Sequence, residues 1–215
     1  MSRPKEFEND DVLDRAGELF WKFGYQATSI PELEAATGIG RGSLYNTFGD
    51  KEALYLAALG RYQVKFGAPL RSHLNDENVG DGIRKMLEAV VDRMVRSDVP
   101  NGCLNTSSCV ENDGRSKRIS SVVAANLDSI ESHLQDAIQR AIRTKQIPRI
   151  TNAKQLARFF VAVAQSLGVI NRASSDVTRL SDIVAVAMNV WPAPPTTRVV
   201  GTRPTSSRRR ESGRG

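Results

Sequence analysis

Polar side chains that can donate hydrogen bonds in pairs lie close together in one short stretch of the sequence. Arg41 can donate two parallel hydrogen bonds to guanine, and Asn46 can pair with adenine in the same two-bond manner. Ser43 can face either base, while Gly42 has no side chain and lets the backbone approach a partner closely. These residue types suit the recognition of base edges in the major groove of DNA.

Two short helices joined by a tight turn are predicted around these side chains. Ser29 can cap the first helix, because Glu32 follows it at the spacing of a capping box, and Gly38 can end this helix. The second helix begins soon after Gly38 and places Leu44 and Phe48 on one face, four residues apart. With that face turned inward, the polar residues face outward. In a helix-turn-helix of this kind, the second helix enters the major groove.

The stretch is similar to the DNA-binding signature of TetR-family transcriptional regulators over about a quarter of the chain. The matching residues are Thr28, Ser29, Gly38, Ile39, Gly40, Ser43, Leu44, Tyr45, Phe48, Lys51 and Leu54. The resemblance implies that Tyr45 contacts a phosphate. It also implies that Thr28, Ser29 and Lys51 hold the DNA backbone. The expected DNA contacts are therefore Thr28, Ser29, Arg41, Gly42, Ser43, Tyr45, Asn46 and Lys51.

An all-α fold with two helical domains is predicted for the chain. The expected parts are a three-helix helix-turn-helix DNA-binding domain in residues 1–52, a larger effector-binding and dimerisation domain in residues 53–195, and a basic disordered tail in residues 196–215. The first helix is expected at residues 8–23 after a disordered start. The helix that begins at residue 51 is expected to break or kink at Gly67-Ala68-Pro69. Further helices are expected at residues 81–96, 103–112, 116–145, 153–172 and 176–191.

The net charge of +6 resides in the C-terminal tail rather than in the helix-turn-helix. Residues 196–215 hold six arginines and one glutamate, a net charge of +5, so residues 1–195 sum to +1. Residues 1–60 hold six basic and ten acidic residues, a net charge of −4. The motif therefore has to carry the prediction of DNA binding. The tail either adds non-specific affinity for DNA or serves only solubility.

Cysteine usage and hydropathy favour a cytoplasmic protein with no membrane partner. The two cysteines, Cys103 and Cys109, are too few for a disulfide scaffold. The most apolar run, residues 159–170, is shorter than the ~20 residues that span a bilayer. The N-terminal residues also lack the apolar segment of a secretory signal.

The last two predicted helices carry apolar residues at a spacing typical of helix-on-helix packing. In the first of them, apolar residues repeat at intervals of four, three, four and three. Such a seam can close the chain's own core, or it can form half of an intersubunit four-helix bundle, which is how TetR-like proteins dimerise. The resemblance favours the homodimer. The expected interface consists of Leu156, Phe160, Val163, Leu167, Ile170, Ile183, Val184, Ala187 and Trp191.

A small-molecule effector is expected in the larger domain, and two kinds of site are open. A reversible apolar ligand would lie near Phe66, Met86, Met94, Cys103 and Phe159. Alternatively, Cys103 itself is the sensor, since residues 100–104 resemble a Gly-Cys-Leu element of TetR-like subfamilies, including ones that sense reactive electrophiles. A nearby helix N-terminus would lower the pKa of this thiol. The competing interpretation makes Cys103 a small buried core residue.

No pattern of catalytic, cofactor-binding or metal-binding residues is predicted. The sequence has no phosphate-cradling glycine loop and no nucleophile elbow, and His73 and His133 are isolated. The predicted function is a ligand-responsive regulator, most simply a repressor that binds a palindromic double-stranded DNA operator as a homodimer and releases it when an effector binds. The alternatives are a Cys103-based electrophile or redox sensor, and a weakly specific DNA-binding protein. Activation in place of repression stays open.

Overall fold

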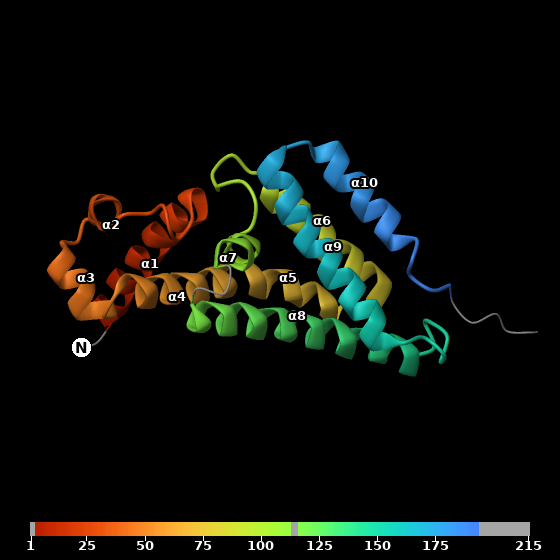
Figure 1. Cartoon of the computed structure of the whole chain (residues 1–215). Helices are drawn as coiled ribbons and strands as arrows, with labels where there is room; N and C mark the ends of the chain where they lie inside the picture. The colour runs from red at the N-terminus through yellow and green to blue at the C-terminus, as the bar shows by residue number, and fades with distance from the viewer. Residues whose placement is uncertain (1–2, 113–115, 194–215) are drawn as a thin grey trace, which may run out of the picture.

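The computed structural model describes residues 3–112 and 116–193, and every regular element in that part of the chain is helical (Figure 1). The elements are α1 (Arg3–Phe23), α2 (Ile30–Thr37), α3 (Arg41–Phe48), α4 (Lys51–Tyr62), the π-helical segment η1 (Gln63–Gly67), α5 (Ala68–Ser72), the short 3-10 helix η2 (His73–Asn75), α6 (Val79–Met94), α7 (Leu104–Asn112), α8 (Lys117–Arg143), α9 (Ala153–Ala173) and α10 (Val177–Met188). This confirms the predicted all-α fold. The tail predicted to be disordered, residues 196–215, lies outside the described residues.

Short polar side chains fix where most of the helices begin. At six helices the side chain of the residue before the first turn accepts a hydrogen bond from a backbone N–H of that turn, which otherwise has no partner within the helix. These capping residues are Ser29, Asp50, Asn78, Ser116, Asn152 and Asp176. The first helix differs from expectation: α1 begins at Arg3, so the disordered start predicted for residues 1–8 is wrong for residues 3–8.

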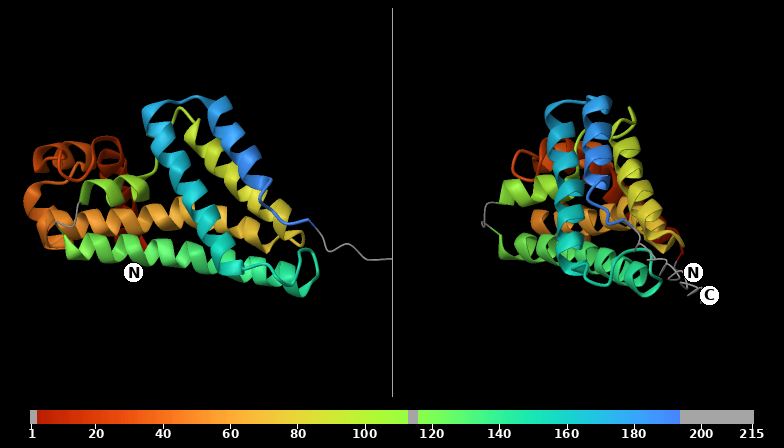
Figure 2. Two further views of the ribbon diagram at one scale, coloured as in Figure 1. Left: turned by 45° about the vertical axis from the view of Figure 1, so that its right-hand side comes forward. Right: turned by 90° about the vertical axis from the view of Figure 1, so that its right-hand side faces the viewer.

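The predicted irregularity at Gly67-Ala68-Pro69 takes the form of a wider turn within a continuing helix. α4, η1 and α5 follow one another in one line (Figures 1 and 2). Pro69 lies in the first turn of α5, where its missing N–H is tolerated. The π-helical segment just before it loosens the hydrogen-bond ladder, which is a common feature of functional sites.

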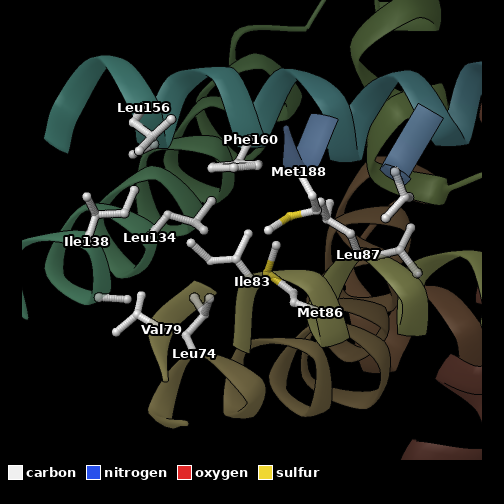
Figure 3. Close-up of a cluster of buried hydrophobic side chains, with 14 of the residues drawn as sticks. Leu74, Val79, Ile83, Met86, Leu87, Leu134, Ile138, Leu156, Phe160 and Met188 are labelled. Atoms are coloured by element: carbon white, nitrogen blue, oxygen red, sulfur yellow. The ribbon is translucent and has the colours of Figure 1, made fainter. Parts of the chain in front are cut away.

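Two clusters of buried apolar side chains hold the helices together. The first comes from α1 to α4 with contributions from α7 and α8: Val12, Ala16, Phe20, Trp21, Leu33, Leu44, Leu54, Tyr55, Ala58, Leu59, Tyr62, Leu104, Ile119 and Val123. The second joins α6, α8, α9 and α10. Figure 3 shows part of this second cluster, where Ile83, Leu134 and Phe160 converge. Because the first cluster includes α7 and α8, the helix-turn-helix packs directly on the rest of the chain.

The arrangement of the helices separates a small end from a larger bundle. α3 lies at one end of the molecule and the last turn of α10 at the other (Figure 1). α9 and α10 lie side by side and both pack against α6 (Figure 2). α7 lies between the two ends and contacts α1, α4, α8 and α9. Among the described helices, none combines the length and the apolar character needed to cross a bilayer.

Candidate DNA interface and sensor site

Local hydrogen bonds hold the α2–α3 unit together. Ser29 and Glu32 form the predicted capping box: the backbone N–H of Ser29 donates to the Glu32 carboxylate at 2.7 Å, and the N–H of Glu32 donates to Ser29 Oγ at 3.4 Å. Hydrogen bonds from the Ser29 backbone and hydroxyl lower the pKa of the Glu32 carboxyl. Gly38 then ends α2 with a φ of 74°, a value that side chains disfavour. The motif is therefore locally determined.

The front of α3 presents the predicted base-reading residues to solvent. The exposed ones are Arg41, Gly42, Ser43 and Asn46. Leu44 is buried and anchors the helix to the first core. The guanidinium of Arg41 lies 5.3 Å from the centre of the half-buried Tyr45 ring, one turn further along. α3 thus offers an arginine and an asparagine on one accessible face.

The beginning of α3 is completed by a residue that sequence reasoning missed. The residue before the first turn is Gly40, which has no side chain to cap the helix. The carboxylate of Glu34 on α2 instead accepts a hydrogen bond from the backbone N–H of Arg41. A negative charge is favourable at a helix N-terminus, so Glu34 stabilises the start of α3 and links it to α2. The seven-residue separation of Glu34 and Arg41 follows no common capping pattern.

Thr28 is a correction to the expected set of DNA contacts. Its side chain is 1% exposed, and its hydroxyl donates to the carbonyl of Gly24 at 2.6 Å. The side chain therefore faces the fold and holds the turn after α1. A phosphate contact by this hydroxyl would require that turn to open.

Lys51 braces the same turn. Its ammonium lies 3.5 Å from the carbonyl oxygen of Gln26 and 4.7 Å from the centre of the Tyr25 ring. Burial lowers the pKa of Lys51, an effect that the negative charges of Glu32 and Glu111 oppose. A phosphate near Lys51 would share the ammonium with the Gln26 carbonyl.

A carboxylate from the larger part of the chain also reaches this turn. Glu111, in the last turn of α7, accepts a hydrogen bond from the backbone N–H of Tyr25 at 2.7 Å. Gly24 has a φ of 88°, and a Cβ there would lie 1.7 Å from a carboxylate oxygen of Glu111. The positive φ therefore favours glycine at position 24, and a Cβ there would displace the flexible end of the Glu111 side chain. The sequence held no signal of this contact, since the two residues lie far apart along the chain.

A cavity of about 720 Å³ opens where α1 meets α4, η1, α5 and α6. Of the five predicted pocket residues, only Phe66 lines it. Met86 and Met94 belong to the second core cluster, with exposures of 4% and 2%, and Phe159 lies on the outer face of α9. These three residues lie outside this cavity, and their role in effector binding stays a prediction. The methionines fill the core because their face of α6 is the one that meets the other helices.

One side of the cavity is built around Arg93 of α6. Its guanidinium lies 6.0 Å from the centre of the Trp21 ring, 5.7 Å from that of Tyr62 and 5.8 Å from that of Phe66. Arg93 Nη1 also donates a hydrogen bond to the Tyr62 hydroxyl at 2.8 Å. Tyr62 belongs to α4, and its hydroxyl donates in turn to Cys103 Sγ at 3.4 Å. Sequence reasoning missed Arg93, Trp21 and Tyr62, which only the tertiary packing brings together.

Cys103 lies behind this cluster rather than on the cavity wall. Burial alone raises the pKa of its thiol, but the positive charge of Arg93 and the hydrogen bond from Tyr62 hold the pKa below its ordinary value. Cys109 is exposed, and its pKa is raised by partial burial of the thiol and by Cys103. Both cysteines are free. Cys103 therefore has the charge environment of a reactive thiol in a half-buried position.

The predicted dimer seam is largely part of the chain's own core. Five of its residues are buried there: Leu156, Phe160, Leu167, Val184 and Ala187. Val163, Ile170, Ile183 and Trp191 are half-buried at the edge of the same core. These five residues lie in the chain's own core, and their place in an interface stays a prediction. The pattern indicated helix packing correctly, but the partners are α6 and α8 of the same chain.

A second row of residues on α9 and α10 remains open to solvent. On α9 it includes Phe159, Ala162 and Val169, with Phe159 36% and Val169 54% exposed. On α10 it includes Val186 and Val190, 66% and 48% exposed. On each helix these residues lie on a face next to the one that carries the buried seam. In the described residues no group of three or more histidine, cysteine or carboxylate side chains could hold a metal ion.

Comparison with protein-family models places two matches on this chain. The model of the bacterial regulatory proteins of the tetR family matches residues 12–58, which contain α2 and α3. The model of the tetracyclin repressor-like C-terminal domain matches residues 81–187. The two matches include most residues of both core clusters.

Curated relatives and solved structures agree with these matches. The chain is 29% identical over 192 residues to the HTH-type transcriptional repressor ComR of Escherichia coli, covering 88% of this chain and 91% of ComR. It is also 29% identical over 192 residues to the transcriptional regulator YezE of Bacillus subtilis, covering 88% and 99%. A cysteine-substituted TetR family transcriptional regulator, CifR, crystallised with 26-base-pair operator DNA, superposes with a TM-score of 0.81 at 27% identity over 85% of this chain and 96% of that one.

Proposed function

Because this chain belongs to the TetR family of bacterial transcriptional regulators, we propose that it is a repressor that binds a palindromic operator as a homodimer and releases it when an effector occupies the cavity beside α1. The observation that carries the proposal is the exposed polar front of α3, with Arg41 and Asn46 on one face of a helix whose other face is anchored by Leu44. Such a helix can enter the major groove without rearrangement.

Base recognition is assigned to Arg41 and Asn46. Each can form two hydrogen bonds to a purine edge, and Gly42 allows the backbone of α3 to come close. Ser43, Tyr45, Ser29 and the ammonium of Lys51 would hold the sugar-phosphate backbone, which positions the helix without reading the sequence. Thr28 supports the site from within the fold.

Dimerisation is assigned to the exposed apolar row on α9 and α10. Phe159, Ala162 and Val169 would face Val186 and Val190 of a second copy across a two-fold axis. Such an interface would bury side chains that otherwise remain in water. A two-fold dimer presents its two α3 helices to half-sites about one DNA turn, ~34–36 Å, or a multiple of it apart, so the operator should be palindromic.

Release follows from the position of the cavity. Its walls include α1 of the helix-turn-helix, α4 and α6 of the larger bundle. A ligand that prefers one spacing of these helices would shift the α3 helices out of register with the half-sites. Couplings between ligand and DNA of about 1–3 kcal/mol are usual.

Thiol chemistry at Cys103 is a second candidate for the signal. The observation that favours it is the chain of contacts from Arg93 through the Tyr62 hydroxyl to Cys103 Sγ, which supports a thiolate. Alkylation of Cys103 would displace Tyr62 on α4 and so act on the same helix as a cavity ligand. We further assign no enzymatic activity to the chain and place it in the cytoplasm, where the chromosome is accessible.

A footprinting titration on the DNA beside the gene tests the proposed function. A palindromic protected site is expected, and Arg41→Ala should shift its protection to higher protein concentrations while the fold is retained. Protection spread evenly over unrelated DNA would instead identify a weakly specific DNA-binding protein. The titration with and without a thiol-reactive electrophile, for wild type and Cys103→Ser, separates the two kinds of signal: loss of the footprint only in wild type assigns the signal to Cys103.

A further inference from the structure

The charge of Arg93 is held at the cavity wall without an acidic partner. Three aromatic rings surround its guanidinium, and its one hydrogen-bond partner named above is the neutral hydroxyl of Tyr62. Among the described residues, no carboxylate lies within ion-pair distance of Arg93. A guanidinium that has lost part of its hydration is stabilised strongly by an anion, so this position favours a negatively charged partner.

Two N–H donors at the same wall have no acceptor. Arg93 Nε and Trp21 Nε1 are both buried and make no hydrogen bond within the described residues. Trp21 itself is 3% exposed and, like Arg93, lines the cavity. An unsatisfied buried donor costs about 1–3 kcal/mol, and the cost is removed when an acceptor arrives. An oxygen acceptor that reached either N–H would remove this cost.

The acidic residues of the cavity are largely neutralised by other cations. Asp14 accepts from Arg61 at 3.1 Å and from Lys65 at 2.8 Å. Asp11 pairs with Arg15, and Asp98 pairs with Arg96. Glu18 is the remaining acidic residue of the lining, and it is exposed. The lining holds four carboxylates and four cations, and Arg93 is the one of these cations that forms no ion pair within the described residues.

We infer that the cavity binds a small organic acid, whose carboxylate meets the guanidinium of Arg93 and the indole N–H of Trp21 and whose apolar body lies against Leu13, Phe66 and Leu70. The inference rests on the proposed function, because it names the chemical class of the effector. A volume of about 720 Å³ is in the range of sites for drug-sized ligands.

An organic cation fits the same wall less well. Cationic ligands are commonly held on the faces of aromatic rings. Here Arg93 already occupies the space between the rings of Trp21, Tyr62 and Phe66. A second cation would have to displace it, whereas an anion completes the arrangement.

The carboxylate would bridge two parts of the chain. Trp21 belongs to α1, which carries the helix-turn-helix, and Arg93 belongs to α6 of the larger bundle. A ligand that holds both at once restricts the distance between α1 and α6. This gives the acid a preference for one arrangement of the two parts, which is the requirement for a coupled release of DNA.

Calorimetric titration of the full chain with aromatic monocarboxylates tests the inference. The probes run from benzoate to 4-phenylbutyrate, each with its neutral amide and the matching primary amine. At least one acid should bind, and its amide and amine should bind at least about tenfold more weakly. Equal binding of acid and amide, stronger binding of the amine, or no binding by any acid would overturn the inference.

Variants locate the site. Arg93→Met should weaken acid binding at least about tenfold, Arg93→Lys should weaken it less, and Trp21→Phe should weaken it several-fold because only the N–H is lost. Arg84→Met removes a positive charge from an exposed position of α6 outside the cavity lining and should change binding little. Thermal unfolding without ligand checks that each variant is folded. Unchanged affinity in folded Arg93→Met would overturn the inference.

The footprint separates this inference from the proposed function. A palindromic footprint together with no acid binding would leave the repressor and overturn the acid site. Acid binding that depends on Arg93, together with no specific footprint, would support the site and overturn the proposed function.

Discussion

Glu111 at the end of α7 accepts a hydrogen bond from the backbone N–H of Tyr25, 2.7 Å away in the turn that precedes α2. Cys103, the candidate sensor thiol, directly precedes the first residue of the same helix, Leu104. Ser108 of α7 also shares a hydrogen bond of 2.6 Å with the Tyr55 hydroxyl of α4, so this short helix contacts both α4 and the turn before α2.

We expect Glu111→Gln to lower the free energy of unfolding by about 1–3 kcal/mol, because a half-buried N–H loses a charged acceptor. The measurement is chemical denaturation. Glu131→Gln is the matched control, since Glu131 only forms an ion pair with exposed Arg158 and such pairs contribute about 0–1 kcal/mol. Equal losses in the two variants would refute the role of Glu111. Gly24→Ala should be more destabilising than either, since alanine disfavours a φ of 88° and its Cβ would displace the Glu111 carboxylate from Tyr25.

Base recognition by α3 predicts a specific loss in Arg41→Ala. Operator binding should weaken by about 1–3 kcal/mol, and the preference at one base pair of each half-site should relax, because a two-bond contact to guanine is removed. Competition binding against operators changed at single positions measures both effects. Thr47→Ala, which alters an exposed residue of α3 outside the predicted set, should leave the preference unchanged.

Thr28→Ala should behave differently from a phosphate contact. Its hydroxyl is bonded to Gly24, so the variant should lose about 1 kcal/mol of stability and keep the salt dependence of operator binding. The denaturation midpoint of Thr28→Ala distinguishes a structural role of the hydroxyl, which lowers the midpoint, from a phosphate contact, which leaves it unchanged. Wild-type stability with weakened DNA binding would restore Thr28 to the DNA contacts.

The exposed row on α9 and α10 predicts that Val169→Glu and Val186→Glu yield monomers, since each places a charge in an apolar interface. Sedimentation velocity measures the change. Val110→Glu alters a valine of α7 that is 73% exposed and lies outside this row, so it should remain a dimer. Dimers in all three variants would place the interface elsewhere.

The pKa of Cys103 predicts a pH-dependent reactivity. In the folded chain the pKa of Cys103 is lower than its ordinary value, so alkylation should begin at lower pH than for an ordinary thiol. The thiolate form also stabilises the fold. This contribution to stability is present at high pH and is lost as the pH falls through the folded pKa. In a Cys109→Ser background, Arg93→Met should move the alkylation profile to higher pH, because a positive charge is removed. Arg96→Met should not move it. Mass spectrometry of the alkylation rate against pH distinguishes these outcomes.

The sequence predicted best what is encoded locally. The capping box at Ser29, the left-handed Gly38 and the inward face of α3 depend on residues within a few positions of one another, and each is present. For α9 the spacing identified a packing face but not its partner. A helix can carry a buried seam at Leu156 and Phe160 and an exposed one at Phe159, and only the placement of α6 and α8 decides which face the chain itself covers.

The Arg93 site lay beyond sequence reasoning for a different reason. Its members come from α1, α4, η1 and α6, so no spacing in the sequence relates them. An arginine near the end of an amphipathic helix is ordinarily a solvated residue, and nothing local marks Arg93 as the exception. What distinguishes Arg93 is the three aromatic rings near its guanidinium, which only the fold brings together.

Arg172 connects the two faces of α9. Its guanidinium donates to the carbonyls of Trp21 at 2.7 Å and Lys22 at 3.2 Å, near the end of α1, while the exposed side of α9 carries the proposed contact with the second copy. In that dimer α9 would contact the neighbouring subunit on one side and the end of α1, which precedes the helix-turn-helix, on the other. Binding of one acid molecule would therefore be felt by both subunits, and operator release would follow a sigmoidal rather than a hyperbolic dose response.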